Sequence, residues 1–367
     1  MADQDFIMQM RPLFGDEEKK AICDYMDEDG FITEFKRTQK FEEMIAEFTG
    51  AKHCIAVNNG TVSLTLAAMA VGIKAGDEVI IPNYTMIATP NSVKMFGAIP
   101  VFVDVEDSTL CLDIELVEAA ITPKTKAIMF VSSNGRYPSS GIDAFLSLCE
   151  KYDLKLIEDS AQSLGSYYPD GTHIGRKGSV GSFSFSAPKI ISTGQGGVII
   201  TDDNEIALSL RRLKDFGRDG GGSDIHGSIG FNFKFTELQA VIGIEQMKKL
   251  SDRVARKKEM YLRYQEGLSG LEKIQLFQND MVNTAPWFID VLADQREELM
   301  SFLKKKGIGT RVMYPPINKQ QAYGLPGSYP VSENIGNKGL WLPSMVQLED
   351  DQILYICGCI REFYENS

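Results

Sequence analysis

The sequence contains few residues that could bind a metal ion or form a disulfide. It has three histidines and six cysteines in 367 residues, and no pair of them has the spacing of a zinc or iron site. The cysteines are scattered, mostly within apolar stretches, and no CxxC pair occurs. We therefore expect buried, reduced thiols in a cytoplasmic protein and no metal centre.

Long apolar runs and clusters of positive charge are absent as well. No stretch is apolar for the length that crosses a membrane, and the N-terminus lacks a basic region followed by an apolar one. The net charge is −12, which disfavours nucleic acid as a partner because the two surfaces would repel each other. We expect a cytoplasmic protein that binds neither membranes nor nucleic acid.

The residues that are present have the composition of a globular protein with a large core. Hydrophobic residues make up 43% of the chain and charged residues 24%, and the length allows two domains. Short apolar runs alternate with amphipathic helices over the first part of the chain. This alternation predicts an α/β large domain with three αβα layers around a mainly parallel, mixed sheet. The predicted strands are residues 54–57, 78–82, 101–104, 127–131, 155–159, 182–185 and 198–201.

A change of composition near residue 250 predicts where this domain ends. Residues 236–268 have the pattern of one long helix with a bend near Ser251, apolar in its first half and highly charged in its second. We expect a large domain at 12–250 and a smaller C-terminal α+β domain at 251–367. The elements predicted for the smaller domain are strands at 287–292 and 309–314 and helices at 295–306 and 350–364.

The stretch GSFSFSAPKIISTGQGG, residues 181–197, combines features of a covalent catalytic site. Serines alternate with phenylalanines up to Phe185, which is the period of a strand with one apolar and one hydroxyl face. Ala187 and Pro188 end this strand, Lys189 follows, and a glycine-rich turn leads into the next strand. A partly desolvated lysine on such a loop can form a Schiff base with a carbonyl, including pyridoxal phosphate (PLP), and nearby hydroxyls can bind a phosphate. The alternative is an ordinary solvated lysine beside a turn.

Polar residues follow several predicted strands at their carboxyl ends, where α/β sheets bind ligands. Asp159 ends one strand, and a buried acid there needs several donors or a cation such as a protonated pyridine nitrogen. Gly60 and Thr61 lie between a strand and a helix, so the first N–H groups of that helix could bind an anion. Simple helix capping, by Asp159 in one case and by Asn59 or Thr61 in the other, remains the alternative.

Together these motifs resemble the DegT/StrS-type sugar aminotransferases, which belong to the aspartate-aminotransferase-like (fold type I) PLP enzymes. The resemblance covers nearly the whole chain, and the perosamine synthases look most similar. It implies that the large domain has the fold of the fold type I PLP-dependent transferases. The matching segments are residues 59–61, 76–80, 158–162, 182–189, 194–197, 232–240 and 342–344.

The resemblance implies a catalytic role for two residues. Lys189 would form the internal aldimine with PLP and move the proton, and Asp159 would pair with the pyridine nitrogen. Gln162 would bind the hydroxyl of the ring. The residues implied to hold the phosphate are Gly60, Thr61 and Ser184. The full set implied to bind the cofactor is Gly60, Thr61, Met86, Asp159, Gln162, Ser184, Lys189 and Asn232.

The resemblance also implies how the ring is covered and that two chains share a site. Ala161 would pack on one face of the ring. Met86 stands where the family usually has an aromatic residue, so either its sulfur or Tyr84 would cover the other face. Asn232 would reach the phosphate in the neighbouring subunit, which implies a homodimer with a shared active site.

The sequence departs from the family pattern at positions expected to contact the substrate. Lys234 stands where the family usually has arginine, and a compact ammonium does not replace a bidentate guanidinium. Ser132 and Asn318 stand where histidines are common. Ser179 replaces a frequent acidic residue, and Gln195 replaces the glutamate of a GEGG motif. These departures put the identity of the keto substrate in doubt.

The sequence therefore predicts a PLP-dependent aminotransferase with glutamate as the amino donor. Family members that act as dehydratases carry histidine in place of Lys189. The expected acceptor is a 4-keto-6-deoxy nucleotide sugar, as in polysaccharide biosynthesis, and the alternative is a smaller phosphorylated ketone or keto acid. The expected substrate contacts are Lys234, Arg311 and Tyr314, with Arg136 and Arg218 as further candidate cations unless these charges form surface salt bridges. A PLP-binding regulator and an inactive relative are the remaining hypotheses, and the lack of a basic face argues against regulation at DNA.

Overall fold

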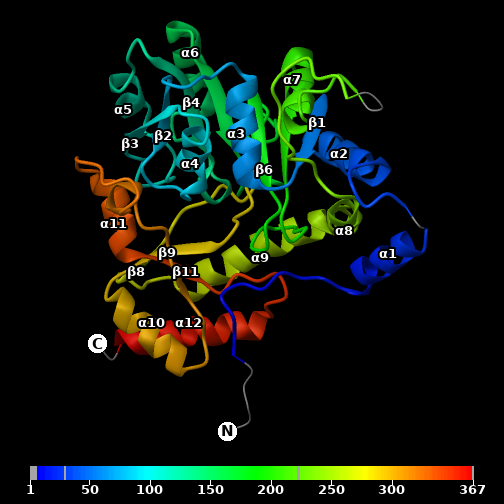
Figure 1. Cartoon of the computed structure of the whole chain (residues 1–367). Coiled ribbons are helices and arrows are strands. Elements are labelled where there is room, and N and C mark those ends of the chain that lie inside the picture. Colours follow the sequence, from blue (N-terminus) through cyan, green and yellow to red (C-terminus); the bar gives the residue numbers. More distant parts are fainter. Residues whose placement is uncertain (1–5, 29, 221–223, 366–367) are drawn as a thin grey trace.

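The computed structural model describes residues 6–28, 30–220 and 224–365, and it contains two sheets (Figure 1). The larger sheet has seven strands in the order β1-β7-β6-β5-β4-β2-β3. All neighbouring pairs are parallel except those that β7 makes with β1 and β6. The predicted mainly parallel, mixed sheet is confirmed. Its strands are β1 (His53–Val57), β2 (Glu78–Pro82), β3 (Ile99–Val103), β4 (Thr125–Val131), β5 (Lys155–Asp159), β6 (Val180–Ser184) and β7 (Gly197–Thr201).

Helices cover both faces of this sheet because its strands are apolar on both sides. In β4, for example, Met129 packs with α3, α4 and α7, whereas Phe130 packs on the opposite face with α6. At the other end of the sheet, Ile200 of β7 packs with α2 and α8. The result is the predicted three-layer arrangement. The helices are α2 (Lys36–Thr49), α3 (Gly60–Ala70), α4 (Ala88–Lys94), α5 (Ile114–Ala119), α6 (Ile142–Tyr152), α7 (Asn204–Lys214) and α8 (Glu237–Lys248).

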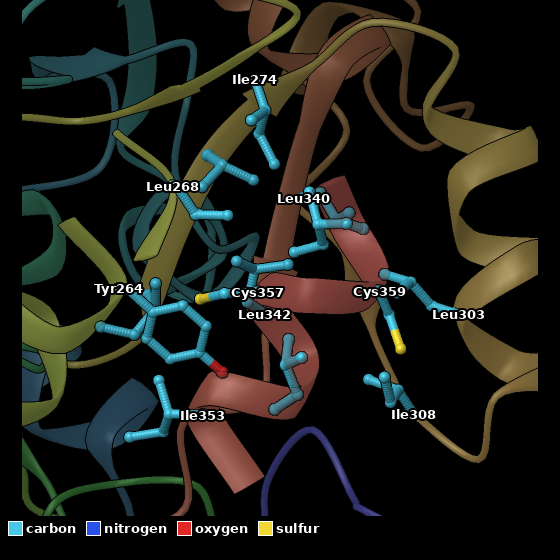
Figure 2. Packing of buried hydrophobic residues seen from close by; sticks show 14 of the residues in the cluster. Tyr264, Leu268, Ile274, Leu303, Ile308, Leu340, Leu342, Ile353, Cys357 and Cys359 are labelled. Atoms are coloured by element: carbon cyan, nitrogen blue, oxygen red, sulfur yellow. The ribbon is translucent and has the colours of Figure 1, made fainter. Parts of the chain in front are cut away.

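The second sheet is antiparallel and lies below the first in Figure 1. Its order is β10-β11-β9-β8, and it packs on α9, α10 and α12. Figure 2 shows the core between them, where Tyr264 of α9, Leu342 of β11 and Cys357 of α12 converge. The elements are α9 (Leu250–Gly267), β8 (Ile274–Leu276), β9 (Ile289–Ala293), α10 (Arg296–Lys305), β10 (Arg311–Val312), α11 (Pro330–Lys338), β11 (Gly339–Leu342) and α12 (Asp350–Glu365).

The beginning of the chain contacts both parts of the molecule. Ile7 pairs with Ile308 and is buried in the core of the second sheet, whereas α1 (Asp16–Asp27) packs against α8. The helix predicted at 236–268 is two helices, α8 and α9, which meet at Lys249 close to the predicted bend. The division into domains at residue 250 stays a prediction.

Several local predictions were wrong. The strand predicted at 309–314 pairs only at Arg311 and Val312, since Pro315 and Pro316 follow and have no N–H to donate. The strand predicted at 287–292 begins only at Ile289. Five cysteines are buried as expected, but Cys23 on α1 is exposed. Among the described residues no helix has both the length and the apolar character that a membrane crossing requires.

Candidate active site

One cavity opens at the carboxyl ends of the parallel strands, where ligands bind in sheets of this kind. Its volume is about 480 Å³. Nine of the residues in the sets predicted to bind the cofactor or contact the substrate lie in its wall, although they come from both parts of the molecule. They are Gly60, Thr61, Met86, Asp159, Gln162, Ser184, Lys189, Arg311 and Tyr314.

Lys189 lies in this wall on the loop between β6 and β7. The loop turns at once after the strand, since the Lys189 N–H donates to the Ser186 carbonyl at 3.0 Å. The side chain is half-buried, and its Nζ lies 4.2 Å from the ring centroid of Trp287. Burial lowers the pKa of Lys189 to about 8, although the negative charge of Asp159 acts to raise it. At pH 7 about a tenth of this amine is therefore uncharged and nucleophilic, and the fraction rises steeply towards pH 9.

Asp159 faces the same cavity from the end of β5 and is 5% exposed. Its Oδ2 accepts a hydrogen bond from the Thr89 hydroxyl at 2.8 Å, and its Oδ1 accepts one from the Ala161 N–H at 3.3 Å. Burial raises the pKa of Asp159, and these two donors and the charge of Lys189 oppose that rise. No described cation forms a salt bridge with this carboxylate, so a protonated ring nitrogen would supply the missing charge.

The start of α3 forms a cradle for an anion. Asn59 caps this helix, since its Oδ1 accepts from the Val62 N–H at 2.9 Å. The N–H groups of Gly60 and Thr61 precede that point and have no acceptor within their own helix. Ser184 of β6 lies so close that a Cβ on Gly60 would stand 2.7 Å from the Ser184 Cβ. Two N–H groups and nearby hydroxyls thus meet at a helix N-terminus, which is the arrangement that phosphates favour.

Gln162, Ala161 and Met86 complete the wall around Asp159 and Lys189. The Gln162 Oε1 accepts from the Asn134 N–H at 2.6 Å, which orients the amide. Met86 is 44% exposed and is therefore free to pack against a ring in the cavity. Tyr84, the alternative to Met86, is buried outside the cavity wall, and its ring packs against Tyr314.

Some of the candidate cations already form ion pairs within the chain, and one does not with any described residue. Arg136 is buried in an ion pair with Asp290 at 2.6 Å, so it is not available to a substrate. Lys234 and Arg218 both bind Asp215, at 2.6 and 3.0 Å, and neither lines the cavity. Arg311 lines the cavity and forms no salt bridge with a described residue. Asn232 also lies outside the cavity wall of its own chain.

Of the departures from the family pattern at positions expected to contact the substrate, only Gln195 lines the cavity. Ser132 is buried at the end of β4, outside this wall. Asn318 is likewise buried, and it exchanges hydrogen bonds with Asn83. Within one chain, therefore, most of these departures lie away from the space that a substrate could occupy.

Two contacts of the site were not predicted from the sequence. Thr89 lies on α4 and supplies a hydroxyl to Asp159, and Trp287 precedes β9 and covers Lys189. Thr89 was not among the residues singled out in the sequence. Trp287 comes from the second part of the molecule, and the one local hint was its rarity, since the chain has two tryptophans. Within the described residues no group of histidine, cysteine and acidic side chains could hold a metal ion.

The chain is similar to proteins of known activity. Residues 13–361 match the model of the DegT/DnrJ/EryC1/StrS aminotransferase family. GDP-perosamine synthase of Escherichia coli O157:H7 is 34% identical over 98% of this chain and 99% of its own length. GDP-perosamine synthase of Vibrio cholerae is 32% identical over 96% and 98%. The crystal structure of DesV from S. venezuelae, in complex with a ketimine intermediate, covers 97% of this chain and 99% of its own at 33% identity, with a TM-score of 0.90.

Proposed function

Since this chain belongs to the DegT/DnrJ/EryC1/StrS aminotransferase family, whose members depend on PLP, we propose that it transfers an amino group from glutamate to a 4-keto-6-deoxy nucleotide sugar. The observation that carries the proposal is that Lys189 and Asp159 face one cavity at the carboxyl ends of the sheet. The GDP-perosamine synthases that align over almost the whole chain support a nucleotide-sugar acceptor. A smaller phosphorylated ketone or keto acid is the alternative acceptor.

The residues around the cavity suit the phosphate, the ring and the basic nitrogen of PLP. The start of α3 and Ser184 would hold the phosphate, and Asp159 would pair with the ring nitrogen. Gln162 would bind the ring hydroxyl, and Met86 would cover one face of the ring. When bound, PLP supplies an electron sink for the charge that develops on the donor carbon.

Lys189 has the position and the basicity for the proton transfers of the reaction. We assign to its Nζ the removal of the proton from the α-carbon of the amino donor. With the cofactor bound, the resulting ammonium would return the proton to the carbon on the other side of the transferred nitrogen, two bonds from the α-carbon, so charge and atoms would balance. The same steps in reverse aminate the acceptor ketone. A general base is most effective when its pKa lies close to the pH of the medium, and the pKa of about 8 meets this condition near neutral pH.

Arg311 and Tyr314 are the groups that we assign to the acceptor. The guanidinium of Arg311 has no carboxylate partner among the described residues and can bind a phosphate or a carboxylate in a bidentate manner. Tyr314 lies beside it in the cavity wall, and burial raises the pKa of its hydroxyl, which therefore stays a hydrogen-bond donor. A panel of nucleotide sugars and small keto acids, each tested with glutamate, distinguishes the two acceptor classes.

We also propose that two chains associate and that Asn232 and Lys234 serve the site of the partner. Both residues lie outside the cavity of their own chain, beside exposed apolar side chains. The exposed apolar side chains come from residues 31–35 and 216–231. The first segment lies close to the end of the second because Thr33 pairs with Thr236, and within the second the Phe216 N–H donates to the Phe231 carbonyl. An apolar patch of this kind is usual at an interface, and sedimentation of the purified protein tests for the dimer. The exposed side chains are Phe31, Ile32, Phe35, Phe216, Ile225, Ile229 and Phe231.

Reduction with borohydride followed by mass spectrometry of the peptides tests the central assignment. We expect a pyridoxyl adduct on Lys189 in the wild-type protein and none at this position in Lys189→Arg. Addition of glutamate should bleach the absorbance of the bound cofactor, which a PLP-binding regulator would not show. An adduct on another lysine, or none after reconstitution with PLP, contradicts the proposal.

A further inference from the structure

A second lysine is buried close to the cavity without forming an ion pair with any described residue. Lys257 lies on α9 and is 4% exposed. Its Nζ donates to the carbonyl oxygen of Trp287 at 2.8 Å and to that of Ser344. Burial lowers the pKa of Lys257 to about 7, and an uncharged amine has two N–H groups for these two carbonyls. Such a group is costly to bury compared with an apolar side chain of the same volume, so its place calls for an explanation.

Trp287 connects this lysine to the loop that carries Lys189. Its ring centroid lies 4.2 Å from the Lys189 Nζ, and its Nε1 donates to the Pro188 carbonyl at 2.7 Å. One side chain therefore contacts both the candidate nucleophile and the backbone just before it. The indole is 4% exposed and closes this side of the cavity.

The segment that bears Trp287 is also held from the opposite direction. The side chain of Asn134 accepts from the Phe288 N–H at 2.7 Å and donates to the Phe288 carbonyl at 2.8 Å. The Asn134 N–H in turn binds Gln162. Lys257 on one side and Asn134 on the other thus leave the Trp287–Phe288 peptide little freedom to move.

We propose that Trp287 is a positioning residue for Lys189 and that Lys257 acts on Lys189 through Trp287. The indole excludes water from the Lys189 amine and, through Pro188, holds its loop against the cavity. Lys257 holds the carbonyl of Trp287 and so fixes the ring in this position. The inference rests on the proposed function only in taking Lys189 as the reacting amine.

Competitive labelling of the cofactor-free protein tests this inference without substrate or PLP. A trace of an amine-reactive reagent is applied over a range of pH, and the label on Lys189 is compared with that on exposed Lys124 in the same digest. Burial is the largest influence on the pKa of Lys189. Admitting water in Trp287→Ala should therefore raise the midpoint of its labelling by about one pH unit, which is about a tenfold loss of label at neutral pH.

A double-mutant cycle separates an effect through Trp287 from a direct effect of charge. Lys257→Met keeps the volume and removes both hydrogen bonds, and we expect it to raise the midpoint for Lys189 as well. If Lys257 acts through the indole, it has no further effect in the Trp287→Ala background. An effect of Lys257→Met that persists there, or its absence in the wild-type background, overturns the coupling.

Two further variants keep the test informative. Trp341→Phe changes the other tryptophan, which packs edge-on against Trp287, and should leave the midpoint for Lys189 unchanged. If Trp287→Ala does not fold, Trp287→Phe keeps a ring over Lys189 but loses the bond to Pro188, and it should still move the midpoint. An unchanged midpoint in a folded Trp287 variant overturns the positioning role, even where the adduct on Lys189 has been found.

Discussion

At the scale of single residues, the candidate site depends on how burial changes two ionisable groups. The Lys189 amine has a pKa lowered to about 8, and Asp159 has a raised pKa because the carboxylate is taken out of water. The uncharged form of the Lys189 amine can attack an aldehyde, and the buried Asp159 carboxylate is stabilised by a positive charge beside it. A cofactor with an aldehyde for the amine and a basic nitrogen for the acid meets both needs.

The lowered pKa of Lys189 predicts how cofactor uptake depends on pH. Below about 8 the side chain is a protonated ammonium and cannot attack the aldehyde, whereas above this value it is a free amine. The rate of PLP uptake by the cofactor-free protein should thus rise about tenfold from pH 7 to pH 9 and then level off. Stopped-flow absorbance measures this rate. A rate that keeps rising steeply above pH 9 would show that the amine is not desolvated.

The hydroxyl of Thr89 should be needed to keep Asp159 ionised. Thr89→Val keeps the shape of the side chain but removes the donor at 2.8 Å, so the pKa of Asp159 should rise further. A hydrogen bond to a charged group contributes about 1.5–3 kcal/mol, and we expect kcat/KM for amino transfer to fall at least about tenfold. Thr89→Ser retains a hydroxyl and serves as the control. Equal activities of the valine and serine variants would refute this role.

At the scale of secondary-structure elements, the N-terminus of α2 is capped by a residue distant in sequence. The N-cap residue of this helix, Phe35, has no side-chain acceptor. Glu237, at the start of α8, instead accepts from the N–H groups of Phe35, Arg37 and Thr38 and from the Thr38 hydroxyl. A carboxylate at this position also interacts favourably with the helix dipole. One buried side chain therefore fixes the position of α2 against α8.

Replacement of Glu237 should destabilise the protein well beyond an ordinary surface change. Glu237→Ala leaves the two buried Thr38 donors and the part-buried N–H groups of Phe35 and Arg37 without this acceptor, and we expect a loss of about 3 kcal/mol in the free energy of unfolding. Glu245→Ala, on the same helix, removes a salt bridge to the exposed Lys248 and should cost less than about 1 kcal/mol. Urea denaturation of both variants measures the difference, and similar losses would contradict the capping role.

At the scale of the whole molecule, a buried ion pair joins the two sheets. Arg136 follows β4 of the large sheet, and its guanidinium binds both carboxylate oxygens of Asp290 on β9, at 2.6 and 3.2 Å. Its Nε also donates to the Thr109 carbonyl at 2.9 Å. The side chains are 3% and 2% exposed, so neither charge has water as an alternative partner. The pair thus fixes the second sheet relative to the first.

Removal of one partner of this pair should be much worse than removal of both. Arg136→Met or Asp290→Leu leaves an uncompensated buried charge and should lower the free energy of unfolding by about 3–5 kcal/mol. The double variant leaves no buried charge, so its loss should be clearly smaller than either single loss. Denaturant unfolding of the three variants tests this, and additive losses would show that the pair is not coupled.

The sequence by itself determined the sheet, most of the helices and the candidates for catalysis. Apolar alternation and the Gly60–Thr61 turn are local patterns, and so are the acid at the end of β5 and the lysine after β6. Strands that lie parallel must end at the same edge. The gathering of Asp159, Lys189 and the start of α3 at one cavity could therefore be predicted without the structure.

The tertiary structure alone decided which side chains are available in that cavity. Nothing near Arg136 in the sequence indicates Asp290 as its partner, and nothing near Lys189 indicates Trp287. Such contacts depend on how the second sheet packs against the first. The packing then decides whether a charged side chain forms an ion pair within the protein or remains available to a ligand. For this reason Arg311 remains available, Arg136 does not, and the surroundings of Lys189 could not be inferred from its neighbours in sequence.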